Sequence, residues 1–219
     1  MKFKELKKDL PKEIYEVLNK EIDELRPCQE KSIKKGLFKN KNMLICTPTA
    51  SGKTLVAELA LTNNIKKGKA IYIVPLKALA NEKFKDFKKK YNHLFHIAIS
   101  IGDLDSADPY LEKYDLIFCT AEKLDSLIRH NAPWLKEVKT VIVDEIHMMN
   151  DIGRGPTLEI LITILKKTLK QMQFIGLSAT IGNPKELADW LDAELIIDNW
   201  RPTKLEKGTY FDGEIEFEK

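Results

Sequence analysis

The chain has 219 residues, 43% of them apolar, which is enough to bury one substantial core. Lys and Arg number 36 against 33 Asp and Glu, and the resulting net charge of +3 does not by itself indicate a nucleic-acid-binding protein. The sequence lacks an apolar run of about 18 residues, residues 1–10 lack the apolar core of a signal peptide, and the three cysteines are not spaced as metal ligands. We therefore expect a cytoplasmic protein with no membrane partner and with buried, reduced cysteines.

Short β-branched runs alternate with amphipathic stretches along the chain. Runs that are apolar on both faces are typical of buried parallel strands, and apolar residues spaced by three and four are typical of helices. We expect strands at 42–47, 70–75, 96–102, 115–120, 140–145, 173–180 and 193–198, and helices at 55–67, 77–91, 121–130, 154–170 and 182–192. This alternation predicts an α/β domain with a parallel sheet of about seven strands, flanked by helices on both sides.

The helix expected at 77–91 contains a lysine-rich stretch, "KFKDFKKKY", at 83–91. Such a charge run is typical of a solvated helix face. A contact with nucleic acid is the alternative.

The sequence "TPTASGKT" at 47–54 nearly matches the phosphate-binding pattern G-x-x-x-x-G-K-[ST]. It lies between a predicted strand and a predicted helix, as a P-loop requires. Gly52, Lys53 and Thr54 supply the backbone turn, the ammonium and the hydroxyl that bind phosphates and magnesium. Thr47 replaces the first glycine of the pattern, at a position that mainly shapes the entry to the turn. The alternative is a chance Gly-Lys-Thr in a lysine-rich chain.

A second motif, "VIVDEIH" at 141–147, ends an apolar strand in two adjacent carboxylates. We expect Asp144 to hold magnesium and Glu145 to orient or deprotonate a water molecule. An exposed acidic turn is the alternative, but it is less common for such a pair after a P-loop. Together the two motifs predict an ATPase.

Further motifs follow the other predicted strands. They are "PLKALANEK", "TAEKLDSLIR", "RGPTLEILI", "IGLSAT" and "ADWLDAELIIDNWRP". In combination with "VDEIH", they resemble superfamily-two helicases of the Ski-like DExH branch, and in particular archaeal repair helicases of the Hel type, which are related to the helicase part of polymerase theta. The resemblance extends from about Leu10 to Asp212. It implies a RecA-like P-loop NTPase fold.

The resemblance also implies roles at an ATP and Mg²⁺ site. Gln29 in "LRPCQ" matches the glutamine that reads adenine, with a surface glutamine capping a helix as the alternative. Lys53 and Glu145 match catalytic groups, and Thr54 and Asp144 match magnesium ligands. His147 matches a histidine that contacts the hydroxyl motif across the interdomain cleft. The nucleotide-binding loop comprises Thr47, Pro48, Thr49, Ala50, Ser51, Gly52, Lys53 and Thr54, and the hydroxyl motif that couples ATP to strand separation comprises Ser178, Ala179 and Thr180.

A single-stranded nucleic-acid path is implied in the same way. Such a path contacts phosphates mainly through backbone amides, hydroxyls and helix N-termini, which is compatible with a weak net charge. An ordinary surface ion pair is the alternative for Arg154. The matching positions are Pro75, Lys77, Ala78, Gly102, Asp103, Thr120, Glu122, Lys123 and Arg154.

The resemblance implies that residues 1–212 form the first RecA-like domain, and that 213–219 begin a linker to a second RecA-like domain that the sequence does not contain. We expect the ATP-binding motor domain of a 3′ to 5′ DNA helicase that acts on single-stranded or forked DNA in replication-fork repair, nearly inactive when isolated. The alternatives are an RNA helicase of the same branch and a catalytically silent nucleotide-binding module.

Overall fold

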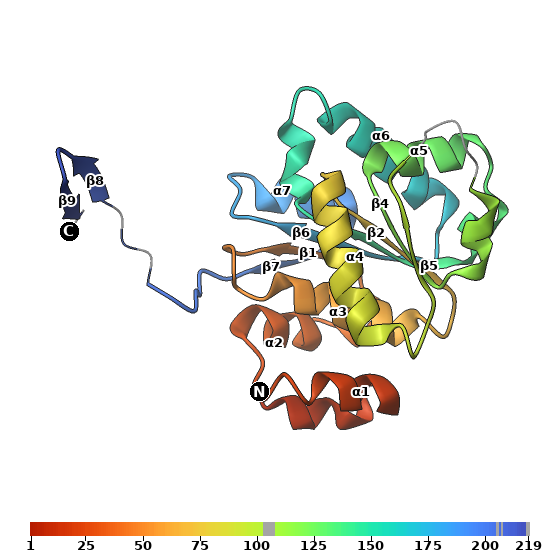
Figure 1. Cartoon of the computed structure of the whole chain (residues 1–219), viewed down its shortest axis with the longest axis horizontal. Coiled ribbons are helices and arrows are strands. Elements are labelled where there is room, and N and C mark those ends of the chain that lie inside the picture. The colour runs from red at the N-terminus through yellow and green to blue at the C-terminus, as the bar shows by residue number, and fades with distance from the viewer. Residues whose placement is uncertain (103–107, 205, 207, 218–219) are drawn as a thin grey trace.

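The computed structural model describes residues 1–102, 108–204, 206 and 208–217, and within this part a seven-stranded parallel sheet forms the centre (Figure 1). Its strands are short and, apart from the edge strand β7, almost wholly buried, as expected for β-branched runs covered on both faces. The strand order is β3-β4-β2-β5-β6-β1-β7. The strands are β1 Met43–Cys46, β2 Lys69–Ile73, β3 Ile97–Ser100, β4 Leu116–Cys119, β5 Val138–Val143, β6 Gln173–Ser178 and β7 Glu194–Ile197.

Helices cover both faces of this sheet. On one face lie α1 Lys12–Leu18, α2 Pro27–Lys34, α3 Lys53–Asn64 and α4 Lys77–Tyr91, and on the other α5 Ala121–Arg129, α6 Gly155–Thr168 and α7 Pro184–Leu191. Short 3₁₀ segments connect them: η1 Phe3–Lys8, η2 Leu37–Lys39, η3 Pro109–Lys113, η4 Pro133–Glu137 and η5 Ile146–Asn150.

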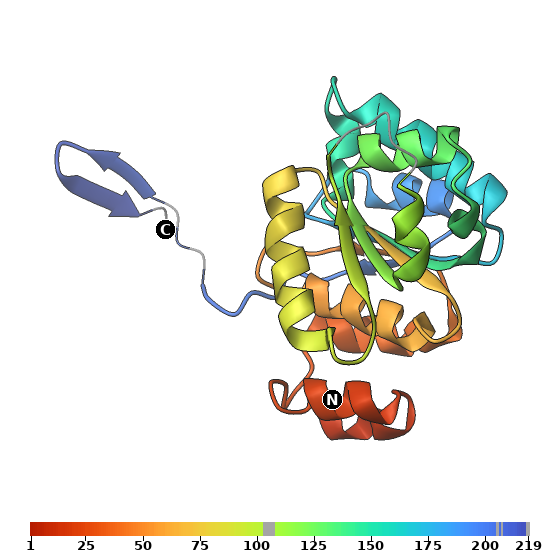
Figure 2. The same ribbon diagram turned by 45° about the vertical axis from the view of Figure 1, so that its right-hand side comes forward.

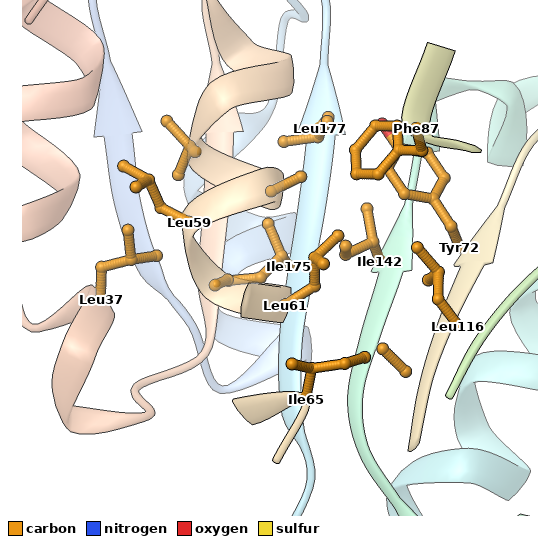
Figure 3. Packing of buried hydrophobic residues seen from close by; sticks show 14 of the residues in the cluster. Leu37, Leu59, Leu61, Ile65, Tyr72, Phe87, Leu116, Ile142, Ile175 and Leu177 are labelled. Carbon is orange, nitrogen blue, oxygen red and sulfur yellow. The ribbon is translucent and has the colours of Figure 1, made fainter. Parts of the chain in front are cut away.

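The larger hydrophobic cluster lies between the sheet and the helices α1 to α4 (Figure 3). Leu61 of α3 lies beside Ile175 of β6 in this view, Leu59 lies on the side of Leu37, and Tyr72 of β2 stacks on Phe118 with ring centroids 5.1 Å apart. Each fully buried aliphatic or aromatic side chain of this kind contributes about 1.5–3 kcal/mol. The cluster therefore holds α3, and the loop that precedes it, firmly against the sheet.

The strand order places three carboxyl ends side by side. β6 pairs with β1 on one side and with β5 on the other, in parallel. The chain segments that follow these strands begin at Thr47, Asp144 and Ala179. The loop, the acidic pair and the hydroxyl motif therefore meet at one edge of the sheet, where ligands of open parallel sheets bind.

The expected strands and helices are all confirmed, with ends that differ by a few residues. Two regions were not predicted. The N-terminal residues form η1, α1 and α2, and residues 208–217 form an antiparallel hairpin of β8 Gly208–Phe211 and β9 Glu214–Phe217. The hairpin turns at Asp212 and Gly213, both with positive φ, in the geometry that favours Asp-Gly.

This hairpin is exposed along both strands and stands apart from the sheet in both views (Figures 1 and 2). The domain boundary predicted after residue 212 falls inside its turn, and remains a prediction. Among the described residues, no helix combines the length and the apolar character needed to cross a membrane.

Candidate nucleotide and nucleic-acid site

The loop 47–52 joins β1 to α3 in a compact turn. Ala50 and Gly52 have positive φ values of 62° and 95°, whereas Thr47 does not. Thr47 instead forms a hydroxyl hydrogen bond of 2.7 Å with Ser51 Oγ, and its N–H donates to the Ser178 carbonyl oxygen at 3.3 Å. Because Thr47 needs no left-handed backbone, a threonine can occupy this first position of the pattern.

Lys53 opens α3 and points back into the loop. Its Nζ donates to the carbonyl oxygens of Thr47 at 2.8 Å and Pro48 at 3.2 Å, and the side chain is buried. Burial lowers the pKa of Lys53 below its ordinary value. The nearby carboxylates of Glu145 and Asp144 act in the other direction and offset part of this effect. The loop's own carbonyls thus hold the ammonium where phosphate oxygens would meet it.

Arg26 and Gln29, at the start of α2, hold the loop from the other side. Gln29 Nε2 donates to the Gly52 carbonyl at 3.0 Å, its Oε1 accepts the Arg26 N–H at 2.7 Å, and Arg26 Nη1 donates to the Ala50 carbonyl at 2.5 Å. The φ of 95° at Gly52 favours glycine, and a Cβ there would also lie 2.3 Å from Gln29 Nε2, so Gln29 would have to move. Gln29 is buried, not on the surface, although it does cap α2 as the alternative proposed.

Asp144 follows β5 and is buried among polar groups. Its Oδ2 accepts a hydrogen bond from the Tyr72 hydroxyl at 3.0 Å and lies 3.4 Å from Lys83 Nζ, which also donates to Thr54 Oγ1 at 3.2 Å. Burial, followed by the Asp144 charge, raises the pKa of Tyr72 well above its ordinary value, so this hydroxyl stays a donor. The two predicted magnesium ligands, Thr54 and Asp144, therefore both contact one ammonium group.

His147 joins the acidic pair to the hydroxyl motif. Its Nδ1 accepts the Ala179 N–H at 3.4 Å and lies 3.4 Å from Glu145 Oε2. The predicted contact of His147 therefore forms within this domain, through the backbone of Ala179, and not across an interdomain cleft as expected. Ser178 is buried and its Oγ makes no hydrogen bond within the described part of the chain, whereas Thr180 is exposed.

The residues predicted to contact nucleic acid lie at strand ends and helix starts. Arg154 Nη1 donates to the Pro75 carbonyl at 2.9 Å, which brings two of these segments together. Lys77 and Ala78 are exposed in the first turn of α4, and Gly102 is exposed after β3. Asp103 lies outside the described residues.

The predicted contacts from α5 divide into two kinds. Thr120 caps the helix, since its Oγ1 accepts the Lys123 N–H at 3.4 Å, and Glu122 is half-buried. The Lys123 side chain is only 1% exposed and its Nζ lies 3.1 Å from Asp108 Oδ2. Since this ammonium is buried against a carboxylate, the structure argues against a contact between the Lys123 side chain and a bound strand.

The fold and this site match a known family. A sequence model described as DEAD/DEAH box helicase matches residues 26–187, which include the loop, the acidic pair and the hydroxyl motif. The chain belongs to the DEAD/DEAH box helicase family. Its seven-stranded sheet with helices on both faces is the RecA-like α/β fold of these helicases.

Individual helicases are similar over most of the chain. The ATP-dependent DNA helicase Hel308 of Methanocaldococcus jannaschii is 58% identical over 205 residues, covering 90% of this chain and 17% of that protein. Hel308 of Pyrococcus horikoshii is 51% identical over 221 residues, covering the whole chain and 30% of that protein. The structure resembles the DUF1998 helicase MrfA bound to DNA, with a TM-score of 0.74 and 27% identity over 87% of this chain and 30% of MrfA. The chain thus spans less than a third of the length of these relatives.

Three residues of the helicase site were not predicted to act there: Arg26, Tyr72 and Lys83. Arg26 is only three residues before Gln29, but the sequence pattern offers no partner for it. Tyr72 lies in a buried strand and looks like an ordinary core residue. Lys83 belongs to the stretch interpreted as a solvated helix face, yet its side chain is only 19% exposed, so that interpretation was wrong at this position.

Proposed function

We propose that this chain is the ATP-binding motor domain of an ATP-dependent 3′ to 5′ DNA helicase. One observation carries the proposal: three neighbouring strand ends bring Lys53, the Asp144–Glu145 pair and Ala179 together, and His147 Nδ1 accepts the Ala179 N–H while lying 3.4 Å from Glu145. Such an arrangement joins a phosphate-binding loop to a hydrolytic carboxylate and to a segment that can report the state of the nucleotide.

Nucleotide binding would use groups that the loop already presents. The ammonium of Lys53 would exchange its two carbonyl partners for phosphate oxygens, which make stronger, charge-assisted hydrogen bonds. Gln29, next to the loop, offers an amide that can both donate to and accept from the edge of adenine. These contacts would distinguish ATP from other triphosphates by the base.

Magnesium fits the residues at Thr54 and Asp144. Both present oxygen atoms, which this ion prefers, and an ammonium already contacts both of them, so the position attracts a cation. Within the described residues, no cluster of three or more His, Cys, Asp or Glu could hold a metal alone, so phosphate oxygens would complete the coordination. When bound, magnesium would offset the charge of the phosphates.

Glu145 would accept a proton from the attacking water. It is half-buried, and its N–H donates to Asp144 Oδ1 at 3.1 Å, which fixes the backbone at this point. Its positive φ of 50° turns the side chain away from the strand direction. His147, in contact with both Glu145 and Ala179, would transmit a change at the γ-phosphate to the hydroxyl motif.

The single strand would cross the edge of the sheet largely through backbone groups and helix N-termini. The described residues proposed for this path are Pro75, Lys77, Ala78, Gly102, Thr120, Glu122 and Arg154. DNA is favoured because the similar Hel308 proteins are named DNA helicases and MrfA was crystallised with DNA. By the same resemblance, we propose forked DNA under repair as the substrate. The three free cysteines support a cytoplasmic location.

Full activity would need a second RecA-like domain facing this edge. The chain covers only 17–30% of the relatives' length, and an opposing domain usually supplies arginines that act on the transferred phosphoryl group. Loss of such an arginine costs on the order of 10³ to 10⁵ in rate. The chain alone would therefore fold, bind nucleotide weakly and hydrolyse it slowly.

The decisive experiment measures ATP hydrolysis with single-stranded DNA and with RNA of matched sequence. The chain would be tested alone and joined by a covalent linker to a second RecA-like domain of the same family, which raises the effective concentration of that domain. We expect DNA-stimulated turnover and unwinding of a tailed duplex only in the joined protein.

The other outcomes separate the alternatives. Greater stimulation by RNA would favour an RNA helicase of the same branch. Nucleotide binding without turnover in the joined protein would favour a silent nucleotide-binding module. Rapid hydrolysis and duplex separation by residues 1–219 alone would contradict the proposed dependence on a second domain.

A further inference from the structure

Two lysines of α4, Lys83 and Lys90, are partly buried, and of these Lys83 is the one paired with Asp144. The Lys83 side chain turns toward the sheet and is 19% exposed, whereas Lys85, Lys88 and Lys89 on the same helix are exposed. The Lys83 ammonium lies 3.2 Å from Thr54 Oγ1 and 3.4 Å from Asp144 Oδ2. It also lies 6.0 Å from the centre of the Tyr72 ring. A charged group in this half-buried position needs these partners to offset the loss of water.

The partners of Lys83 are the two groups assigned above to magnesium. Within the described residues, the Asp144 carboxylate has three polar partners: Oδ1 accepts the Glu145 N–H, and Oδ2 meets the Tyr72 hydroxyl and Lys83. The carboxylate is 7% exposed, so an unpaired negative charge there would be costly. Lys83 supplies a positive charge in direct contact with this carboxylate.

An ammonium and a divalent ion cannot both approach these oxygens without strong repulsion. Two like charges a few ångströms apart in a partly buried site interact much more strongly than in bulk water. An incoming magnesium ion must therefore compete with Lys83 for Thr54 and Asp144. Lys83 sits on a long, flexible stem and can withdraw toward the exposed side of α4 without moving the helix.

We propose that Lys83 is a positioning residue that holds Thr54 and Asp144 ready in the nucleotide-free domain and is displaced by magnesium when nucleotide binds. The proposal rests on the proposed function, because it assumes that magnesium and nucleotide bind here. It assigns to Lys83 two opposite effects. The lysine supports metal-free nucleotide binding by its charge, and it raises the magnesium concentration needed for tight binding.

The measurement is the dissociation constant of a fluorescent, non-hydrolysable ATP analogue, with EDTA and across a magnesium titration. For Lys83→Met we expect the ratio of the metal-free constant to the magnesium-saturated constant to rise about tenfold, and the half-saturating magnesium concentration to fall. Lys83→Arg, which keeps the charge, should restore values near those of the parent chain. Lys85→Met removes the same charge from an exposed position on the same helix and should change neither value.

A purely structural ion pair would give a different result. It would weaken binding equally with and without magnesium, and an unchanged or lower ratio in Lys83→Met would overturn the proposal. Circular dichroism checks the fold of each variant, and Lys83→Gln replaces the methionine variant if that one does not fold. Absence of nucleotide binding by the parent chain under both conditions would instead overturn the proposed function, and this inference with it.

Discussion

The side-chain amide of Gln29 donates to the carbonyl oxygen of Gly52 at 3.0 Å, so the residue predicted to read the base also holds the loop predicted to bind the phosphates. Its other end is bonded to the Arg26 N–H. Both polar atoms of Gln29 therefore have hydrogen-bond partners within the protein. Base recognition and loop geometry are thus linked through one side chain.

We predict that Gln29→Ala lowers affinity for ATP and removes most of the preference for ATP over GTP. The loss of paired hydrogen bonds to a base edge is worth about 1–3 kcal/mol of discrimination. Competition binding with both nucleotides measures the two effects. Gln171→Ala, at an exposed glutamine, is the matched control and should leave them unchanged. Unaltered selectivity in Gln29→Ala would remove this residue from the base site.

Lys53 and Thr47 should respond very differently to substitution. We expect Lys53→Ala to abolish detectable binding of magnesium–ATP, because the ammonium would meet the phosphate charge directly. Thr47→Gly loses only the hydroxyl bond to Ser51 and some backbone rigidity, so stability should fall by about 1 kcal/mol while binding is largely kept. Calorimetric titration measures nucleotide binding by both variants, and thermal unfolding measures their stability. Equal loss of binding in Lys53→Ala and Thr47→Gly would contradict the different roles proposed for these two residues.

Glu145→Gln should keep nucleotide binding and lose turnover. The amide retains the shape of the side chain but cannot accept a proton, and general-base catalysis is typically worth about 10² to 10⁴ in rate. Turnover is measured with the chain joined to a second RecA-like domain. Glu159→Gln, on the exposed face of α6, makes the same chemical change away from the site. Hydrolysis by Glu145→Gln at close to the parental rate would rule out this residue as the base.

The three cysteines should be unreactive in the folded chain. Burial raises the pKa of Cys46 to about 11 and of Cys119 to about 12, and it also raises the pKa of Cys28. A raised pKa keeps the thiol protonated, so at pH 8 only about one Cys46 in a thousand would be a thiolate even with free access. Labelling with a thiol reagent at pH 8 should be slow until the protein is unfolded in guanidinium. Rapid labelling of the native protein would contradict the burial of these residues.

The positions of the strands and of the two main motifs followed from the sequence alone. A buried parallel strand is a short apolar run, and the P-loop and acidic pair are contiguous in the chain, so local pattern contains most of their information. The threonine at position 47 does not disturb this local pattern, because the position does not need the left-handed backbone of glycine. The Asp-Gly turn of the β8–β9 hairpin is a local signal of the same kind.

The partners of individual side chains were decided only by the tertiary structure. Lys83 and Lys85 look equivalent in a lysine-rich helix, but the rotation of α4 against the sheet directs one toward Asp144 and leaves the other in solvent. Lys123 is buried against Asp108 for the same kind of reason. Such contacts join residues far apart in the chain, and they depend on which strands are neighbours and how each helix is turned, which local periodicity does not specify.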